Sequence, residues 1–443
     1  MLDTELNVMG KMLHTNLGVN DEGHLTLAGR DTVELAESYG TPLMLMDEAR
    51  VRMRMREYTE TMREVFAPGS MPLFASKALS CKEMYRIAHS EGMGTDIVSC
   101  GELYTANSVG FPMEKAYFHG NNKTDKDISY ALDCGVGTFI CDNREELYAL
   151  SAQAKDRGIT QRVILRVTPG IDPHTHEAIN TGKVDSKFGT AIETGQAMEL
   201  IKELLTLPAL ELVGLHCHVG SLCFDSKPFI DAAHIMIAFM AAVREQTGKT
   251  LTVLNLGGGY GVRYVESDPE FSIPENLRLV SAEIKKCCSA NNFPEPQILL
   301  EPGRSIVADA GVTVYTVGSV KTITGYKSYV SVDGGMSDNP RYALYKSDYT
   351  VLNASRAAAE RDFTATVAGR LCESGDLIGE DMLMAKPQRG DKLAVLVTGA
   401  YNYAMSSNYN RVPRPPVVFI APDGETRVAI RRETFEDVAK LDV

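Results

Sequence analysis

Short apolar runs alternate with amphipathic segments through the middle of this chain. Each run is the pattern of a strand buried on both faces, and each amphipathic segment repeats its apolar positions at helical spacing. The eight runs cover residues 73–75, 95–98, 116–119, 138–141, 163–167, 212–216, 252–256 and 297–300. Eight such strand and helix units in roughly 240 residues match the size of a closed (β/α)8 barrel better than an open doubly wound sheet.

The pattern changes on both sides of this region. After residue 303, strand-like segments follow one another with few helices between them, at 312–323, 327–335, 361–372, 392–400 and 415–420. Before it, PLMLMD at 42–47 predicts a strand, and a charged helix is expected from about Glu48 to Val65. We therefore predict an α/β chain with a barrel over 48–308 and a β domain, of β-sandwich or Greek-key type, built from 1–47 and 309–443.

Composition and charge narrow the class of protein. The 443 residues are 44% hydrophobic and 23% charged, which is typical of an ordinary globular protein of two or three domains. The net charge of -13 argues against a protein that binds nucleic acid or anionic lipid. No apolar run reaches the length of a membrane helix, and the first residues lack the features of a signal peptide, so a cytoplasmic protein is expected. The nine cysteines show neither a disulfide framework nor zinc spacing, so no metal is predicted.

Chemically versatile residues follow the predicted strands at their carboxyl ends, where the ligand site of a barrel forms. In chain order they are Lys77, Asp96, His216, Cys217, His218, Ser221, Gly257, Gly258, Gly259, Glu301, Gly303 and Arg304. The glycine run GGGYG lets the backbone approach an anion closely and can cradle a phosphate. It is neither a Walker loop nor a Rossmann fingerprint.

A lysine, a phosphate cradle and a carboxylate at one barrel mouth suggest pyridoxal 5'-phosphate. This cofactor needs an amine for its imine and an acidic partner for its ring nitrogen. Lys77 would supply the amine, and Glu301 would be the acid that keeps the pyridine protonated. His218 is a plausible flat partner for the face of the ring.

With these residues in place, the chain resembles the diaminopimelate decarboxylases. They belong to the fold type III pyridoxal-phosphate enzymes, together with ornithine and arginine decarboxylases and alanine racemase. The resemblance extends over almost the whole chain and is carried by FASKA, DIVSCGELYTA, FHGNNK, RVTPGIDPHTHEAINTG, DSKFG, GLHCHVGS, NLGGGYG, EPGRSIVA, VDGGMSDNPRYALY, CESGD and AMSSNYNR. One departure is Leu222, which stands where a glutamine is common and affects only the expected shape of the pocket floor.

The resemblance implies a role for each matching position. Lys77 would bind the cofactor covalently, His218 would lie against its ring, and Glu301 would pair with its nitrogen. The phosphate would be held by Ser221, Gly258, Gly259, Gly303 and Tyr401, and the cofactor would also be contacted by Asp96, Gly257 and Arg304. The unreactive end of the substrate would be held by Arg304, Arg341, Tyr345, Glu373 and Tyr401. Cys372 would return a proton from a second subunit, so the resemblance also implies a homodimer with shared active sites.

The two arginines bear on the substrate. A guanidinium binds a carboxylate bidentately, so Arg304 and Arg341 predict an amino acid with two carboxylates. The resemblance makes this meso-2,6-diaminopimelate, decarboxylated at its D-centre to L-lysine and carbon dioxide in the last step of lysine biosynthesis. A carboxynorspermidine decarboxylase and an ornithine or arginine type enzyme remain alternatives, as does an ion pair between Arg341 and Asp338. A non-catalytic, partner-binding homologue is the last alternative, and Lys77 and Cys372 argue against it.

Overall fold

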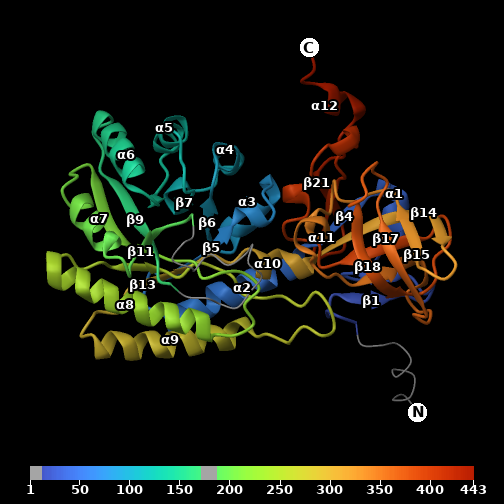
Figure 1. Cartoon of the computed structure of the whole chain (residues 1–443), viewed down its shortest axis with the longest axis horizontal. Helices are drawn as coiled ribbons and strands as arrows, with labels where there is room; N and C mark the ends of the chain where they lie inside the picture. The colour runs from blue at the N-terminus through green and yellow to red at the C-terminus, as the bar shows by residue number, and fades with distance from the viewer. Residues whose placement is uncertain (1–11, 171–186) are drawn as a thin grey trace. The chain divides into compact units, whose positions relative to one another are not determined.

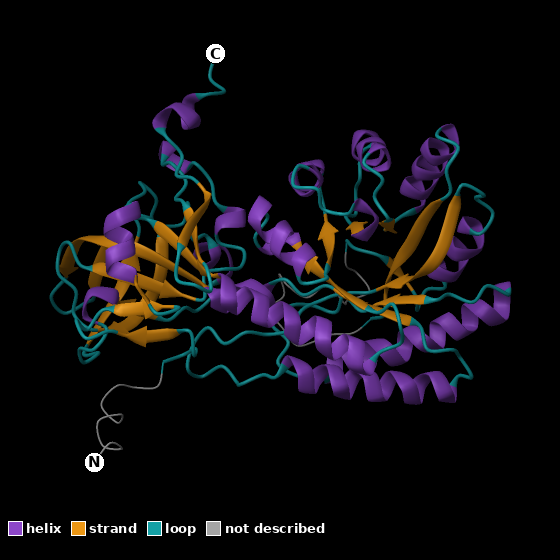
Figure 2. Ribbon diagram, turned by 180° about the vertical axis from the view of Figure 1, so that it is seen from behind, coloured by secondary structure: helices purple, strands orange, loops and turns teal. Residues whose placement is uncertain are grey.

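The computed structural model describes residues 12–170 and 187–443, and the chain divides into two compact units (Figures 1 and 2). The barrel unit comprises Arg54–Gly261 and Phe271–Ser305. The β unit comprises the described residues up to Met53 together with Val262–Glu270 and Ile306–Val443. The segment 262–270 lies inside the barrel range expected from the sequence. It belongs to the β unit because its backbone accepts hydrogen bonds from His14 and Thr350 of that unit, each at 2.9 Å.

Eight parallel strands form the barrel, as predicted. In order they are β5 (Met71–Ala75), β6 (Gly94–Ile97), β7 (Ala116–Phe118), β8 (Thr138–Cys141), β9 (Gln161–Thr168), β11 (Leu210–His216), β12 (Val253–Asn255) and β13 (Gln297–Leu300). Strand β13 pairs with β5 and β8 pairs with β9, so the ring closes. A short strand, β10 (Thr190–Ala191), pairs with β9 beside the ring.

The strands read as nearly continuous apolar runs because strands of a parallel sheet are buried on both faces. Within the barrel unit, one core cluster takes a residue from seven of these strands, among them Leu73, Ile140 and Val253. The covering helices are α3 (Lys82–Ser90), α4 (Cys100–Asn107), α5 (Asp125–Asp133), α6 (Arg144–Asp156), α7 (Gln196–Leu204), α8 (Lys227–Thr247) and α9 (Ile273–Ala290). Figure 1 shows them outside the strands. Side-chain caps fix where several begin, including a capping box between Thr124 and Asp127 at α5.

The β unit is a separate sheet domain that takes in the N-terminal segment, also as predicted. Its main sheet contains β4 (Leu43–Asp47), β14 (Gly311–Thr322), β15 (Ser328–Val332), β16 (Val351–Asn353), β17 (Phe363–Ala368), β18 (Leu377–Met384), β19 (Lys392–Leu396), β20 (Val417–Ile420) and β21 (Thr426–Ile430). Strand β4 lies between β14 and β20, antiparallel to the first and parallel to the second. A small sheet of β1 (Leu17–Val19), β2 (Leu25–Leu27) and β3 (Arg30–Asp31) completes its strands.

The remaining helices are short except one. They are α1 (Thr32–Tyr39), α2 (Glu48–Val65), α10 (Arg304–Val307), α11 (Arg341–Tyr345) and α12 (Phe435–Ala439), and α2 has the bounds expected from the sequence. Strands β16, β18 and β21 were not predicted. Among the described helices, none combines the length and the apolar character needed to cross a bilayer.

Candidate active site

The predicted residues of the barrel unit follow its strands to one mouth. Lys77 lies in a 3-10 turn directly after β5, and Asp96 is the third residue of β6. His218 and Ser221 follow β11, the three glycines follow β12, and Glu301 opens the segment after β13. Parallel barrel strands all present their carboxyl ends at the same face, so these side chains converge although they are distant in sequence.

Lys77 presents its amine beside a buried acid. Its Nζ lies 3.7 Å from Asp96 Oδ2, and the Lys77 side chain is 47% exposed while that of Asp96 is 2% exposed. Among the described residues, neither oxygen of Asp96 accepts a hydrogen bond. The amine is therefore held electrostatically at the mouth and remains accessible to a ligand.

Glu301 is the most heavily contacted acid of the mouth. Its Oε1 accepts a hydrogen bond from Asn255 Nδ2 at 2.6 Å and lies 2.9 Å from His119 Nε2. Its Oε2 bonds to His216 Nε2 at 3.2 Å. Burial opposes ionisation of Glu301, but the contacts with His119 and His216 outweigh burial and hold its pKa well below the usual value. Glu301 is therefore an anion in the folded protein.

The two histidines of GLHCHVGS differ in what they contact. Burial lowers the pKa of His216 to about 4, so at neutral pH it is an uncharged imidazole that donates to Glu301. Burial also lowers the pKa of His218 well below its usual value, and the nearby charge of Lys77 adds to this effect. The Nδ1 of His218 accepts a hydrogen bond from the backbone N–H of Gly258 at 3.2 Å. That bond fixes the orientation of a neutral, flat ring at the mouth.

The glycines after β12 are required by close backbone packing. A Cβ at Gly258 would lie 2.0 Å from the carbonyl oxygen of Glu301, and one at Gly259 would lie 2.1 Å from that of Gly220. Gly259 also has a φ of +119°, which side chains rarely allow. The N–H of Gly257 donates to Asn255 Oδ1 at 2.9 Å, just as that of Gly258 donates to His218. The phosphate contacts expected of these glycines stay predictions.

Ser221 and Arg304 contact each other directly. Nε and Nη2 of Arg304 donate to the Ser221 hydroxyl oxygen at 3.3 and 3.1 Å, and Arg304 is buried. A hydroxyl that accepts from a guanidinium keeps its own proton for another acceptor. The pair can therefore bind an anion, with Ser221 as hydrogen-bond donor and Arg304 as the source of positive charge. Gly303 packs against Ala75 at the base of this corner.

The other predicted residues belong to the β unit, and three of them lie together. Arg341 begins α11, is only 4% exposed, and has its guanidinium carbon 5.2 Å from the ring centre of Tyr345 and 5.6 Å from that of Tyr401. Its Nη2 donates weakly to Ser347 at 3.4 Å, and within the described residues its Nε has no hydrogen-bond partner.

Arg341 also has no acidic partner among the described residues. Asp338, its expected rival partner, instead accepts hydrogen bonds from the Tyr315 hydroxyl and from the N–H of Gly335. A buried guanidinium without an acid is costly unless a ligand supplies one. The arrangement therefore suits a carboxylate ligand.

Cys372 and Glu373 lie on an exposed loop between β17 and β18 of the β unit. The N–H of Cys372 donates to Asn410 Oδ1 at 2.8 Å, and Glu373 accepts from the Tyr409 hydroxyl at 3.3 Å. These bonds tie the loop to the segment 409–410 and leave the thiol at the surface.

The residues of the barrel mouth fit pyridoxal phosphate. They offer an amine, a flat neutral imidazole, an anionic carboxylate, a serine and arginine corner for an anion, and a glycine run whose backbone allows no side chain. The ligand atoms of His119, His216 and Glu301 also lie within 4.8 Å of one another, a spacing that a metal ion could use. We assign no metal there, because the two histidines and Asn255 already contact the carboxylate directly.

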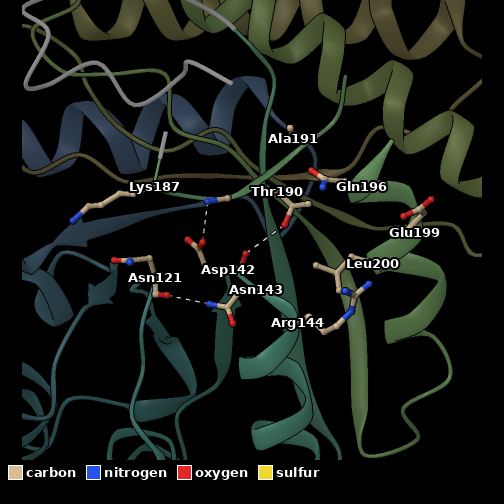
Figure 3. Close-up of a pocket in the computed structure, with 11 residues that line it drawn as sticks. Asn121, Asp142, Asn143, Arg144, Lys187, Thr190, Ala191, Gln196, Glu199 and Leu200 are labelled. Atoms are coloured by element: carbon tan, nitrogen blue, oxygen red, sulfur yellow. Dashed lines mark hydrogen bonds between the residues drawn. The ribbon is translucent and has the colours of Figure 1, made fainter. Parts of the chain in front are cut away.

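A separate cavity of about 430 Å³ lies at the carboxyl ends of β8 and β9, and no predicted site residue lines it (Figure 3). Its wall is polar: Asp142 accepts from the N–H of Gly189 at 2.9 Å, and Asn143 donates to the carbonyl of Asn121 at 3.0 Å. The residues 171–186, which hold most of RVTPGIDPHTHEAINTG and the start of DSKFG, lie outside the described residues.

Sequence reasoning missed two contacts of Glu301 and did not use a third. His119 and Asn255 were part of the predicted strands, and His216 was noted at a strand end without a role. The available signal was position alone, since each is polar and stands within or directly after an apolar strand. Arg166 on β9 was also missed; burial lowers its pKa, and the charges of Asp142 and Glu301 act against that.

Comparison with known proteins supports the same assignment. Residues 49–308 match the pyridoxal binding domain of the pyridoxal-dependent decarboxylases. The chain is 42% identical to the diaminopimelate decarboxylase of Bacillus subtilis over 97% of this chain and 98% of that one. A crystal structure of the M. jannaschii diaminopimelate decarboxylase with L-lysine superposes with a TM-score of 0.89, at 32% identity over 98% and 99% of the two chains.

A related enzyme of different specificity is more distant. The lysine/ornithine decarboxylase of Vibrio vulnificus, in complex with putrescine, superposes with a TM-score of 0.71 at 25% identity, over 88% of this chain and 97% of that one. The similarity to the diaminopimelate decarboxylases thus extends over both units of this chain. The similarity to the lysine/ornithine decarboxylase is weaker. The chain belongs to the pyridoxal-dependent decarboxylases and, among them, to the diaminopimelate decarboxylase family.

Proposed function

We propose that this protein decarboxylates meso-2,6-diaminopimelate at its D-configured carbon, giving L-lysine and carbon dioxide, with pyridoxal phosphate as cofactor. One observation carries the proposal: Lys77, His218 and Glu301 surround one barrel mouth. They do so in a chain that is 42% identical to a diaminopimelate decarboxylase over nearly its whole length. The product, L-lysine, places the reaction at the end of lysine biosynthesis.

Each residue of the barrel mouth then has a defined task. When bound, the cofactor supplies an electron sink for the charge released at the α-carbon. Lys77 tethers the cofactor, and Asp96 stabilises the ammonium while the lysine is free. His218 supports one face of the ring, and Glu301 holds a proton on the ring nitrogen. Ser221 and Arg304 bind the phosphate together with Gly258 and Gly259.

Arg341 is proposed to bind the second carboxylate of the substrate. Its guanidinium is buried, its Nε has no partner among the described residues, and two tyrosine rings fix its plane. A substrate with two carboxylates would satisfy that group, whereas the amine end of ornithine would not. Tyr345, Tyr401 and Glu373 would complete the pocket for the unreactive amino-acid end.

Cys372 is proposed to deliver the final proton to the α-carbon, and to do so across a homodimer. An exposed thiol on a loop anchored by Asn410 is suited to act on a partner's site. The nine cysteines are all free, which fits the reducing environment of the proposed compartment, the cytoplasm.

A substrate panel tests the proposal. The purified protein, reconstituted with pyridoxal phosphate, is incubated separately with meso-diaminopimelate, ornithine, arginine and carboxynorspermidine while carbon dioxide is measured. Release from meso-diaminopimelate with formation of L-lysine is expected, and at least a hundredfold lower kcat/KM is expected for ornithine and arginine because they lack the second carboxylate. Faster release from any other member of the panel would reassign the substrate. The Lys77→Ala variant, which should release none, is the control for background decarboxylation.

A further inference from the structure

Three polar side chains, delivered by three different strands, surround the carboxylate of Glu301. The proposed reaction assigns no role to any of them. His119 follows β7, His216 ends β11 and Asn255 ends β12. Their nearest nitrogen atoms lie 2.9, 3.2 and 2.6 Å from the oxygens of Glu301, and all four side chains are buried. None of the three has been given a role above in binding cofactor or substrate.

Counting acceptor sites shows what the donors leave available. An ionised carboxylate has about four lone-pair sites, two on each oxygen. Asn255 donates to Oε1 and His216 bonds to Oε2, while His119 Nε2 lies 2.9 Å from Oε1 without hydrogen-bond geometry among the described residues. Oε2 is therefore the less crowded of the two oxygens, with one hydrogen-bonded neighbour against two close nitrogens at Oε1.

The state of His216 agrees with this count. Burial lowers its pKa to about 4, so it is neutral and carries one ring proton. Its Nδ1 has no hydrogen-bond partner among the described residues, whereas its Nε2 faces Glu301. The tautomer with the proton on Nε2 is the one that satisfies the buried carboxylate, and it acts as a donor without bringing a second positive charge.

His119 extends the arrangement toward the lysine. Its Nε2 lies between two acids, 2.9 Å from Glu301 Oε1 and 4.0 Å from Asp96 Oδ1. Asp96 in turn lies 3.7 Å from the Nζ of Lys77. The rings of His119 and His216 meet edge to face with centres 5.1 Å apart, so each limits the movement of the other. Arg166 is a further charged group that interacts electrostatically with Glu301.

We propose that His119 and His216 are positioning residues for the cofactor: His216 and Asn255 hold the two oxygens of Glu301 by hydrogen bonds and His119 places its Nε2 against Oε1, so that Oε2 is the oxygen presented to the ring N–H. This inference rests on the proposed function, because it assigns the acid that holds the ring nitrogen. It goes further in naming the oxygen atom and the two imidazoles that orient it.

Cofactor affinity of the apoprotein provides the test, since it does not depend on turnover. His216→Leu removes a hydrogen-bond donor to Glu301 and His119→Leu removes the ring nitrogen that lies against Oε1, both at similar volume, and each is expected to raise the dissociation constant of pyridoxal phosphate about ten- to hundredfold. His216→Gln, whose amide can donate from a similar place, should recover most of that loss. His234→Leu is the matched control, because His234 is an exposed histidine 3.6 Å from Glu283 on the outer helices, and it should leave the constant unchanged.

A double-mutant cycle separates positioning from general damage. In a Glu301→Gln background the acid is gone, so His216→Leu should change the dissociation constant less than twofold if it acts through Glu301. Equal losses in both backgrounds, or no loss from either histidine replacement while Glu301→Gln alone weakens binding, would overturn the inference and leave the proposed function intact. Failure of the unmodified protein to bind pyridoxal phosphate would instead overturn the proposed function. If His216→Leu does not fold, the same cycle is run with His119→Leu and His216→Gln.

Discussion

Replacing Arg341 by methionine should make the protein a poor enzyme without making it less stable. Arg341 is 4% exposed, and among the described residues no acid pairs with its guanidinium and its Nε has no partner. Buried charges without partners destabilise a fold, so a change that removes the charge and keeps the length should be tolerated. In the proposed reaction the same guanidinium is the group that recognises the second carboxylate.

The two opposing effects on stability can be weighed from the structure. Arg341→Met loses two desolvated cation–π contacts with tyrosine rings at 5.2 and 5.6 Å, each of about 2 kcal/mol, and its thioether regains about 0.3–1.5 kcal/mol against each ring. It also removes one buried hydrogen-bond donor that has no partner among the described residues, which should stabilise the folded protein by about 1–3 kcal/mol. The free energy of unfolding should therefore change by no more than about 1–2 kcal/mol, and it should not fall sharply. Denaturant unfolding of the apoprotein measures this directly.

The catalytic effect should be much larger and specific for one substrate group. Loss of one partner from a buried, hydrogen-bonded charge pair costs about 2–5 kcal/mol, so kcat/KM for meso-diaminopimelate should fall roughly 30- to 5,000-fold. D-Lysine has the same reacting centre and chain length but lacks the distal carboxylate. The variant should process D-lysine about as fast as the unmodified protein does, so the preference between the two substrates should nearly vanish.

The comparison of substrates decides between specificity and damage. If Arg341→Met lowers kcat/KM equally for meso-diaminopimelate and D-lysine, or destabilises the protein by more than about 3 kcal/mol, then Arg341 is structural and the substrate assignment loses its main physical support. Arg278→Met is the matched control: Arg278 is half exposed and pairs with Glu64 at 2.9 Å on the outside of the barrel unit. Surface pairs of this kind contribute only about 0–1 kcal/mol, so neither stability nor selectivity should change appreciably.

Three further outcomes are expected. Gly258→Ala would place a Cβ 2.0 Å from a backbone carbonyl at the end of β13, so it should weaken binding of pyridoxal phosphate by roughly 10²-fold. Gly101→Ala is the control, because its new Cβ would meet only an ordinary contact at 3.7 Å, and it should leave binding unchanged. Equal binding by both variants would contradict the close packing at Gly258. Mixing inactive Lys77→Ala and Cys372→Ala proteins should restore up to about a quarter of the activity if each site takes residues from two subunits, and no recovery after verified subunit exchange would count against shared sites. Burial, with the negative charges of neighbouring acids, raises the pKa of Asp338 to about 7, so between about pH 4 and 7 the folded β unit holds a proton that the unfolded chain releases. The free energy of unfolding should therefore fall as pH rises from about 4 to 7. A pH scan of the Asp338→Asn variant should lack this slope.

The barrel and its mouth could be predicted because two simple regularities act together. Strands buried on both faces must be apolar throughout, which made all eight runs visible, and their carboxyl ends must share one face. Lys77 and Glu301 follow from those regularities without any contact being known. Gly258 and Gly259 could also be predicted as site residues from the glycine run itself. The structure explains the run, because an added Cβ would lie 2.0 and 2.1 Å from backbone carbonyl oxygens at these two positions.

The β unit was harder to predict because its strands do not keep a regular pattern. Strand β18 reads LIGEDMLM, with exposed Glu380 and Asp381 in its middle and a positive φ of 52° at Asp381. Its pairing with β17 shifts register twice, so apolar positions do not alternate cleanly. Strand β21 is nowhere fully buried, and β16 has only three residues. The segment 262–270 joined this unit through hydrogen bonds from His14 and Thr350, which no local pattern reveals.

The donors around Glu301 show why a strand-end pattern identifies a site but not its internal contacts. Strand β7, which delivers His119, is separated from β13 by β5 and β6, and β11, which delivers His216, is separated from it by β12. Both contacts therefore cross the mouth of the barrel and do not run between neighbouring strands. Closure of the barrel creates them, and the acid placed at the closed mouth is largely withdrawn from water, with 7% of its surface exposed. Contacts with side chains from non-adjacent strands are then what keeps it ionised, so His119 and His216 become necessary once Glu301 is assigned to the ring nitrogen.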